Sequence, residues 1–127
     1  DENTCSTYYS YNRYNLINKI EIVNESERSY NETINYTYNN SNNLTQFEKI
    51  VEEDNNIVER LFVSFVYDEK KSLTKSNYRI NNSALQTTTY FYDDEKLLIK
   101  EVINDNQEIK YDYDLRYYKV YRMKGGD

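Results

Sequence analysis

An aromatic pair followed by a leucine recurs along this chain and constrains its fold more than any other feature. In each copy two aromatic residues stand at positions i and i+2, and a leucine follows five intervening residues later. The copies are Tyr36/Tyr38 with Leu44, Phe65/Tyr67 with Leu73, Tyr90/Tyr92 with Leu98, and a last pair, Tyr111/Tyr113, that has Lys119 in place of the leucine. Terminal repeats are often degenerate in this way. The pattern indicates a chain built from short repeated units.

The spacing of the repeats indicates that the units are strand hairpins. The second tyrosines of the pairs lie 29, 25 and 21 residues apart, so that each unit is four residues shorter than the one before it. If a unit is two antiparallel strands and two turns, removing two residues from each strand leaves every side chain on its original face, because strand periodicity is two. A helical unit has no such reason to change in steps of four.

Alternation within the aromatic segments agrees with strands. Ile34, Tyr36 and Tyr38 share one face, whereas Asn35 and Thr37 take the other, which is typical of an antiparallel sheet with one less polar face. More polar strands are predicted between the aromatic ones. They are approximately 44–52, 72–80, 96–104 and 116–123, with earlier strands at 16–23 and 28–38. We therefore predict an all-β antiparallel meander of about eight or nine strands, forming an open or single-layer sheet or a small barrel.

The domain organisation follows from length and composition. A chain of 127 residues suits one domain. We expect a polar N-terminal segment over 1–13, a single β domain over 14–123 and a terminal tail over 124–127. The turns are rich in Asn and Asp, which tolerate the left-handed conformation and can replace the glycine that this chain mostly lacks.

One segment also fits a helix. In residues 44–53, Leu44, Phe47, Ile50 and Val51 fall at helical spacing, and Glu48 follows Thr45 as in a capping box. A helix there would make the fold α+β. We favour the strand and keep the helix as the alternative.

Composition excludes several function classes. The net charge of −6 argues against a nucleic-acid partner, because such affinity rests on Lys and Arg neutralising phosphates. No apolar run is long enough to span a membrane. The chain has no histidine and one cysteine, so it lacks the usual base for a nucleophile and the clusters that zinc needs. Acidic stretches such as 93–95 and 112–114 lack the central glycine of a calcium loop and are interpreted as solvated turns. We predict no enzyme activity, no catalytic residue, no metal site and no cofactor.

The phrases "FVYDEKKSLT", "YFYDDEKLLIKEV" and "IKYDYDL" resemble the YD repeats of RHS-type proteins and of related exported proteins and lipoproteins of Bacteroidetes. The resemblance covers roughly residues 34–115. It matches best at Tyr67, Asp68, Leu73 and Thr74, and it departs from the family where a turn glycine is expected. It implies hairpins in a continuous antiparallel sheet, an extracytoplasmic location at the cell surface or in the periplasm, and a lipid tether upstream of Asp1 as one means of attachment.

Tyrosine is the residue type that best suits a binding surface. An exposed tyrosine row can stack on sugars or anchor a protein, whereas a covered row serves as a cross-strand ladder. The predicted binding residues are Tyr90, Tyr92, Tyr111, Tyr113, Tyr117 and Tyr121. We thus expect a non-enzymatic binding or scaffold module that engages a protein or glycan. The alternatives are an acidic immunity or inhibitor protein that neutralises a basic toxin, and a small barrel that binds an apolar ligand.

Overall fold

The computed structural model describes residues 4–25, 29–114 and 119–125, and every regular element in them is a β-strand. The strands are β1 (Cys5–Tyr11), β2 (Ile17–Glu25), β3 (Ser29–Tyr38), β4 (Leu44–Glu53), β5 (Asn56–Tyr67), β6 (Leu73–Ile80), β7 (Gln86–Tyr92), β8 (Leu98–Ile103), β9 (Gln107–Asp114) and β10 (Lys119–Gly125). The predicted all-β antiparallel meander is confirmed. Residues 5–11 form β1 and lie within the predicted polar N-terminal segment over 1–13.

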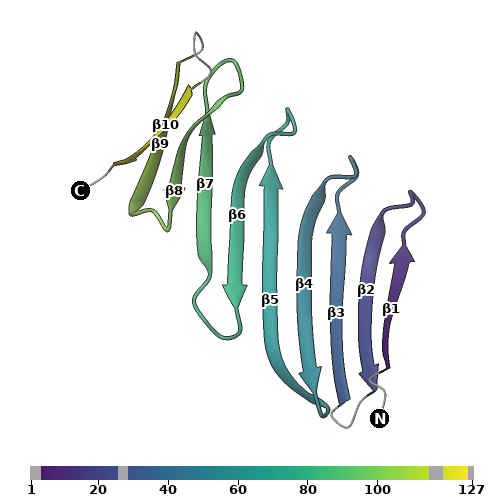
Figure 1. The fold of residues 1–127 in the computed structure, drawn as a ribbon. Coiled ribbons are helices and arrows are strands. Elements are labelled where there is room, and N and C mark those ends of the chain that lie inside the picture. The colour runs from purple at the N-terminus through teal and green to yellow at the C-terminus, as the bar shows by residue number, and fades with distance from the viewer. Residues whose placement is uncertain (1–3, 26–28, 115–118, 126–127) are drawn as a thin grey trace. The chain divides into compact units, whose positions relative to one another are not determined.

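The strand order equals the chain order, from β1 to β10 (Figure 1). Within the described residues β1 is hydrogen-bonded to β2 and β10 to β9, and the two end strands do not pair with each other. The order is therefore open, and the small barrel among the predicted forms is not the one that the chain adopts.

Two compact units make up the chain, and each is described by itself. Unit 1 is Asp1–Ser64 with Tyr78–Ala84, and unit 2 is Phe65–Asn77 with Leu85–Asp127. No helix or second sheet among the described residues covers a sheet face in either unit. The predicted single domain over 14–123 stays a prediction.

In unit 1 the register places Tyr36 and Phe47 on one face. Tyr36 lies opposite Phe47, and Phe47 lies opposite Val63 on the next strand. The Tyr36 and Phe47 rings are tilted against each other, with centroids 6.1 Å apart. Such cross-strand pairs stabilise a sheet whose faces no other described element covers. In β3 the burial of residues 34–38 alternates as predicted, with Ile34, Tyr36 and Tyr38 half-buried and Asn35 and Thr37 exposed.

An ion-pair cluster crosses three strands on the same face. Lys49 of β4 places its Nζ 3.2 Å from Glu32 Oε1 on β3 and 3.7 Å from Glu59 Oε2 on β5. Lys49 lies opposite Ile34 and Leu61 in the register, so its charge sits among apolar neighbours. The hydrogen bond to Glu32 is the main reason that the pKa of Lys49 is raised.

Enclosed side chains are few. Val51 in unit 1 and Ile109 in unit 2, each 6% exposed, are the buried apolar residues among those described. Strand pairing therefore leaves most side chains half-buried by their neighbours and open to water above them. Val51 also settles the ambiguous segment, because residues 44–53 form β4 between β3 and β5 and not a helix.

Candidate functional site

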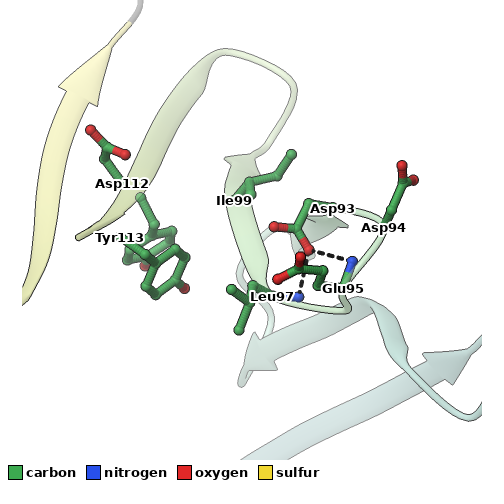
Figure 2. A pocket seen from close by; sticks show the side chains of 8 residues that line it. Asp93, Asp94, Glu95, Leu97, Ile99, Asp112 and Tyr113 are labelled. Atoms are coloured by element: carbon green, nitrogen blue, oxygen red, sulfur yellow. Dashed lines mark hydrogen bonds between the residues drawn. The ribbon is translucent and has the colours of Figure 1, made fainter. Parts of the chain in front are cut away.

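Within the described residues, the turns that follow an aromatic pair are closed by the side chain of their first residue. In unit 2, Asp93 Oδ1 accepts the backbone N–H groups of Glu95 and Leu97, both at 2.9 Å (Figure 2). The Asp93 N–H donates to the Leu97 carbonyl at 3.0 Å, and Lys96 takes a left-handed conformation with φ 67°. Asx side chains bond their own backbone in this way in turns. The Asp93 carboxylate thus has a structural role, which is to accept the hydrogen bonds that hold its turn.

Other turns repeat this arrangement at equivalent positions. Their first residues are Asn12 and Asn39 in unit 1 and Asp68 in unit 2. Each accepts the backbone N–H groups of the residues two and four positions later, as Asp93 does. The residues in the left-handed conformation are Asn15, Asn42 and Lys71. Asn and Lys therefore take the left-handed conformation in turns that contain no glycine.

The tyrosine immediately before a turn ties one hairpin to the preceding one. The Tyr38 hydroxyl donates to the Ile17 carbonyl at 2.7 Å. In unit 2 the hydroxyls of Tyr92 and Tyr113 donate to the carbonyls of Leu73 and Leu98, both at 2.6 Å. In each case the acceptor is the first residue of the neighbouring strand. These tyrosines have a structural role that their sequence positions share.

The other predicted binding tyrosines are also engaged within unit 2. The Tyr90 hydroxyl lies 3.0 Å from Ser76 Oγ, and the Tyr111 hydroxyl donates to the Glu101 carboxylate. Tyr90, Tyr92, Tyr111 and Tyr113 are half-buried. Tyr117 lies outside the described residues, and Tyr121 lies opposite Asp112 in β10, where side chains are not described.

The environment of Tyr92 predicts a loss of stability at alkaline pH. Burial is the main reason that the pKa of Tyr92 is raised above 10.0. A raised pKa means that the folded state prefers the neutral phenol, so the contribution to stability is full below about pH 10 and falls as the pH rises above that value. Urea unfolding followed across this range should show a shallower alkaline fall for Tyr92→Phe than for the unchanged chain. Tyr8→Phe, at a position that is 57% exposed, is the matched control, and an equally steep fall in Tyr92→Phe would contradict the assignment.

Unit 2 has a hollow of about 360 Å³ between the Asp93 turn and β9 (Figure 2). Its lining residues are Asp93, Asp94, Glu95, Leu97, Ile99, Tyr111, Asp112 and Tyr113. Asp94, Glu95 and Asp112 are exposed, and the Asp94 carboxylate points away from Asp93. Among the described residues no cluster of His, Cys, Asp or Glu is arranged to hold a metal ion. The hollow is an acidic surface that suits a cationic group.

Unit 1 carries the most exposed tyrosines of the described chain. Tyr8, Tyr9 and Tyr11 of β1 are 57%, 54% and 57% exposed, and Tyr14 in the following turn is 54% exposed. Tyr8, Tyr9 and Tyr11 lie in the predicted polar N-terminal segment over 1–13, Tyr14 follows it, and none of the four is among the predicted binding residues. The available signal was the pair Tyr9/Tyr11, which stands before Asn12 as Tyr36/Tyr38 stands before Asn39.

A second hollow, of about 500 Å³, lies in unit 1, and Tyr14 is one of the residues that line it. It is lined by Asn12, Arg13, Tyr14, Asn18, Tyr36, Thr37, Tyr38, Asn39, Asn40 and Asn42. The Arg13 guanidinium lies 4.9 Å from the centroid of the Tyr14 ring. Asn18 Oδ1 is buried and has no hydrogen-bond partner within the described chain. The hollow combines an exposed ring, a cation and several amides.

Comparison with known proteins identifies no family. No model of a known protein family matches the chain, and no curated protein matches it either. The described residues contain no helix that is long and apolar enough to cross a membrane. The resemblance to YD repeats remains an expectation from the motifs.

Proposed function

We propose that the protein is a non-enzymatic binding or scaffold module that recognises a glycan through the hollow of unit 1. The observation that carries the proposal is the meeting of the exposed Tyr14 ring with the Asn-rich turns that begin at Asn12 and Asn39. Aromatic rings offer a flat apolar surface for the C–H face of a sugar, and each side-chain amide offers donors and acceptors to its hydroxyls. A glycan on the surface of a partner protein satisfies the same chemistry.

The polar atoms of the hollow leave room for such a ligand. The Oδ1 atoms of Asn12 and Asn39 accept backbone hydrogen bonds within their turns, whereas the Asn18 Oδ1 is buried and has no partner among the described residues. The turn hydrogen bonds do not use the Nδ2 groups of Asn12 and Asn39, and these amides can donate to a sugar hydroxyl. Concave sites with a few converging polar groups are the usual form of small-ligand sites.

An extracytoplasmic location, at the cell surface or in the periplasm, is part of the proposal. It is supported by the resemblance to YD repeats of exported proteins. A signal sequence or lipobox at the start of the complete reading frame would support it, and a reading frame without either would count against it.

Glycan-array binding tests the function directly. The unchanged chain should bind a defined set of glycans, and Tyr14→Ala should weaken that binding by at least about tenfold, as loss of a stacked aromatic contact does. Tyr78→Ala is the matched control, because Tyr78 is a 39% exposed tyrosine of unit 1 outside the hollow. The proposal fails if no glycan binds, or if Tyr14→Ala and Tyr78→Ala bind equally.

The acidic hollow of unit 2 favours a second candidate, an inhibitor of a basic partner. Asp94, Glu95 and Asp112 place exposed carboxylates around one opening, and the net charge of the chain is −6. Opposite charge steers a cationic partner to such a surface. Binding of basic proteins that is lost in Asp94→Asn/Asp112→Asn, and unchanged in Tyr14→Ala, would select this candidate over the glycan module.

A further inference from the structure

We propose that the free edge of β1 binds β10 of a second copy of this chain, so that copies join head to tail and continue the meander. The inference does not depend on the glycan proposal, because it concerns the strand edge and not the hollow. It rests on a hydrogen bond that recurs where one hairpin meets the next.

The recurring bond defines what a junction between hairpins needs. Tyr38 donates to the carbonyl of Ile17 at the junction of β3 with β2, and Tyr113 donates to Leu98 at the junction of β9 with β8. Tyr92 does the same to Leu73. The donor is the tyrosine before a turn, and the acceptor is the first residue of the adjacent strand.

Tyr11 stands at the position of such a donor, but β1 is the end strand of the order, and no described strand pairs with its outer edge. It directly precedes Asn12 as Tyr38 directly precedes Asn39, and Asn12 closes its turn in the same way. Its side chain is 57% exposed, whereas Tyr38 is half-buried. Among the described residues no hydrogen-bond partner of the Tyr11 hydroxyl is found. By analogy with the other junctions, we expect Tyr11 to donate to the carbonyl of the first residue of an antiparallel strand paired with β1.

The edge of β1 lacks the features that usually prevent strand addition. The strand "CSTYYSY" carries no charged residue and no proline. Edge strands of monomers are commonly protected by Lys, Pro or a short length. Seven uncharged residues with exposed tyrosines are instead suited to accept another strand.

Among the described strands β10 supplies the matching edge. β10 begins at Lys119, six residues after Tyr113. The other acceptor strands begin at the same distance from a tyrosine, at Leu98 after Tyr92 and at Ile17 after Tyr11. The pairing of β10 with β9 uses one edge and leaves the other free. A second copy's Tyr11 hydroxyl would then donate to the Lys119 carbonyl.

The register of this contact follows from the junctions inside the chain. At the first junction the acceptor is Ile17 and the donor Tyr38, and Lys19 lies opposite Asn35. At the other the acceptor is Leu98 and the donor Tyr113, and Lys100 lies opposite Lys110. In both, the second residue after the acceptor lies opposite the third residue before the tyrosine. Applied to Lys119 and Tyr11, the rule places Tyr121 opposite Tyr8. The next pair is Arg122 opposite Thr7, and since β1 is uncharged no like charges meet.

A charge swap in the full chain tests the proposal. The unchanged chain should associate as its concentration rises in sedimentation velocity. Thr7→Lys places a lysine opposite Arg122 and should weaken association by about tenfold. Thr7→Lys/Arg122→Glu turns the pair into opposite charges and should restore it. Tyr11→Phe removes one hydroxyl and should weaken association by about three- to tenfold.

The controls separate this contact from others. Val66→Lys adds the same charge at a 47% exposed position of β5 and should leave association unchanged. A chain that stays monomeric at every concentration overturns the proposal. So does association that Thr7→Lys leaves intact, or whose loss Arg122→Glu fails to restore, since a symmetric β1 to β1 contact or another partner would give that result.

Discussion

Ile109→Ala is expected to destabilise unit 2 by about 2–4 kcal/mol, the usual cost of removing a buried aliphatic side chain. Ile109 is 6% exposed and lies opposite Glu101 in the register of β8 and β9. A sheet without a second layer has few side chains that are fully out of water, so one such residue carries a large share of the apolar contribution. Urea unfolding followed by circular dichroism measures the change, because the chain has no tryptophan to report it.

Ile99→Ala is the control for that variant. It removes the same atoms from β8, but Ile99 is 38% exposed, and the expected cost is under about 1.5 kcal/mol, in proportion to the smaller area buried. Equal losses in the two variants would mean that Ile109 is no more important to unit 2 than an exposed strand residue.

Lys49→Met is expected to destabilise unit 1 by about 1–3 kcal/mol, because it leaves Glu32 charged and poorly solvated without its cation. The Glu32 side chain is 15% exposed and also accepts a hydrogen bond from the Tyr30 hydroxyl. Methionine keeps most of the volume of lysine and should pack against Ile34 and Leu61, which lie opposite it. Urea unfolding at neutral pH gives the change in the free energy of unfolding.

The double variant Lys49→Met/Glu32→Gln distinguishes the charge from the packing. If the uncompensated carboxylate causes the loss, removing its charge should return most of the lost stability. A double variant that is less stable than Lys49→Met alone would show that the lysine stem, and not the ion pair, is what unit 1 needs.

Strand order and side-chain faces were predictable because both follow from local spacing. Ile34, Tyr36 and Tyr38 alternate with polar residues, and the register of Tyr36, Phe47 and Val63 shows their shared face. The shortening of the units by four residues does not come from two residues per strand as predicted, because β4 and β5 have 10 and 12 residues whereas β6 and β7 have 8 and 7. β1 was missed because its composition is polar, although Tyr9 and Tyr11 stand before Ile17 as Tyr36 and Tyr38 stand before Leu44. An isoleucine in place of the leucine concealed the copy.

Residues 44–53 show why local periodicity does not always decide between a strand and a helix. Phe47, Ile50 and Val51 satisfy a helical spacing, but they also fit a strand with both faces partly apolar. Pairing on both sides, with β3 and β5, favours the strand, since it satisfies the backbone groups of the segment and encloses Val51. That preference comes from the neighbouring strands and is absent from the segment itself.

The candidate site was less predictable than the fold. The Tyr92 and Tyr113 hydroxyls donate to the first carbonyl of the neighbouring strand. The spacing of the tyrosines does not show where that strand begins, so these hydrogen bonds could not be predicted from it. The hollow of unit 1 brings the turn after Asn12 beside the turn after Asn39, which are 27 residues apart in the sequence. Only strand pairing brings such segments together.

The self-closing turn has a consequence for how such a chain can change over generations. The Asp93 turn satisfies its own backbone through one side chain, and the tyrosine before it needs nothing from the adjoining hairpin except a main-chain carbonyl. Every strand residue has a main-chain carbonyl, whatever its side chain. Duplication or loss of the DNA that encodes one hairpin therefore preserves the contacts at the new joint, and hairpin number can evolve separately from the side chains that the surface displays.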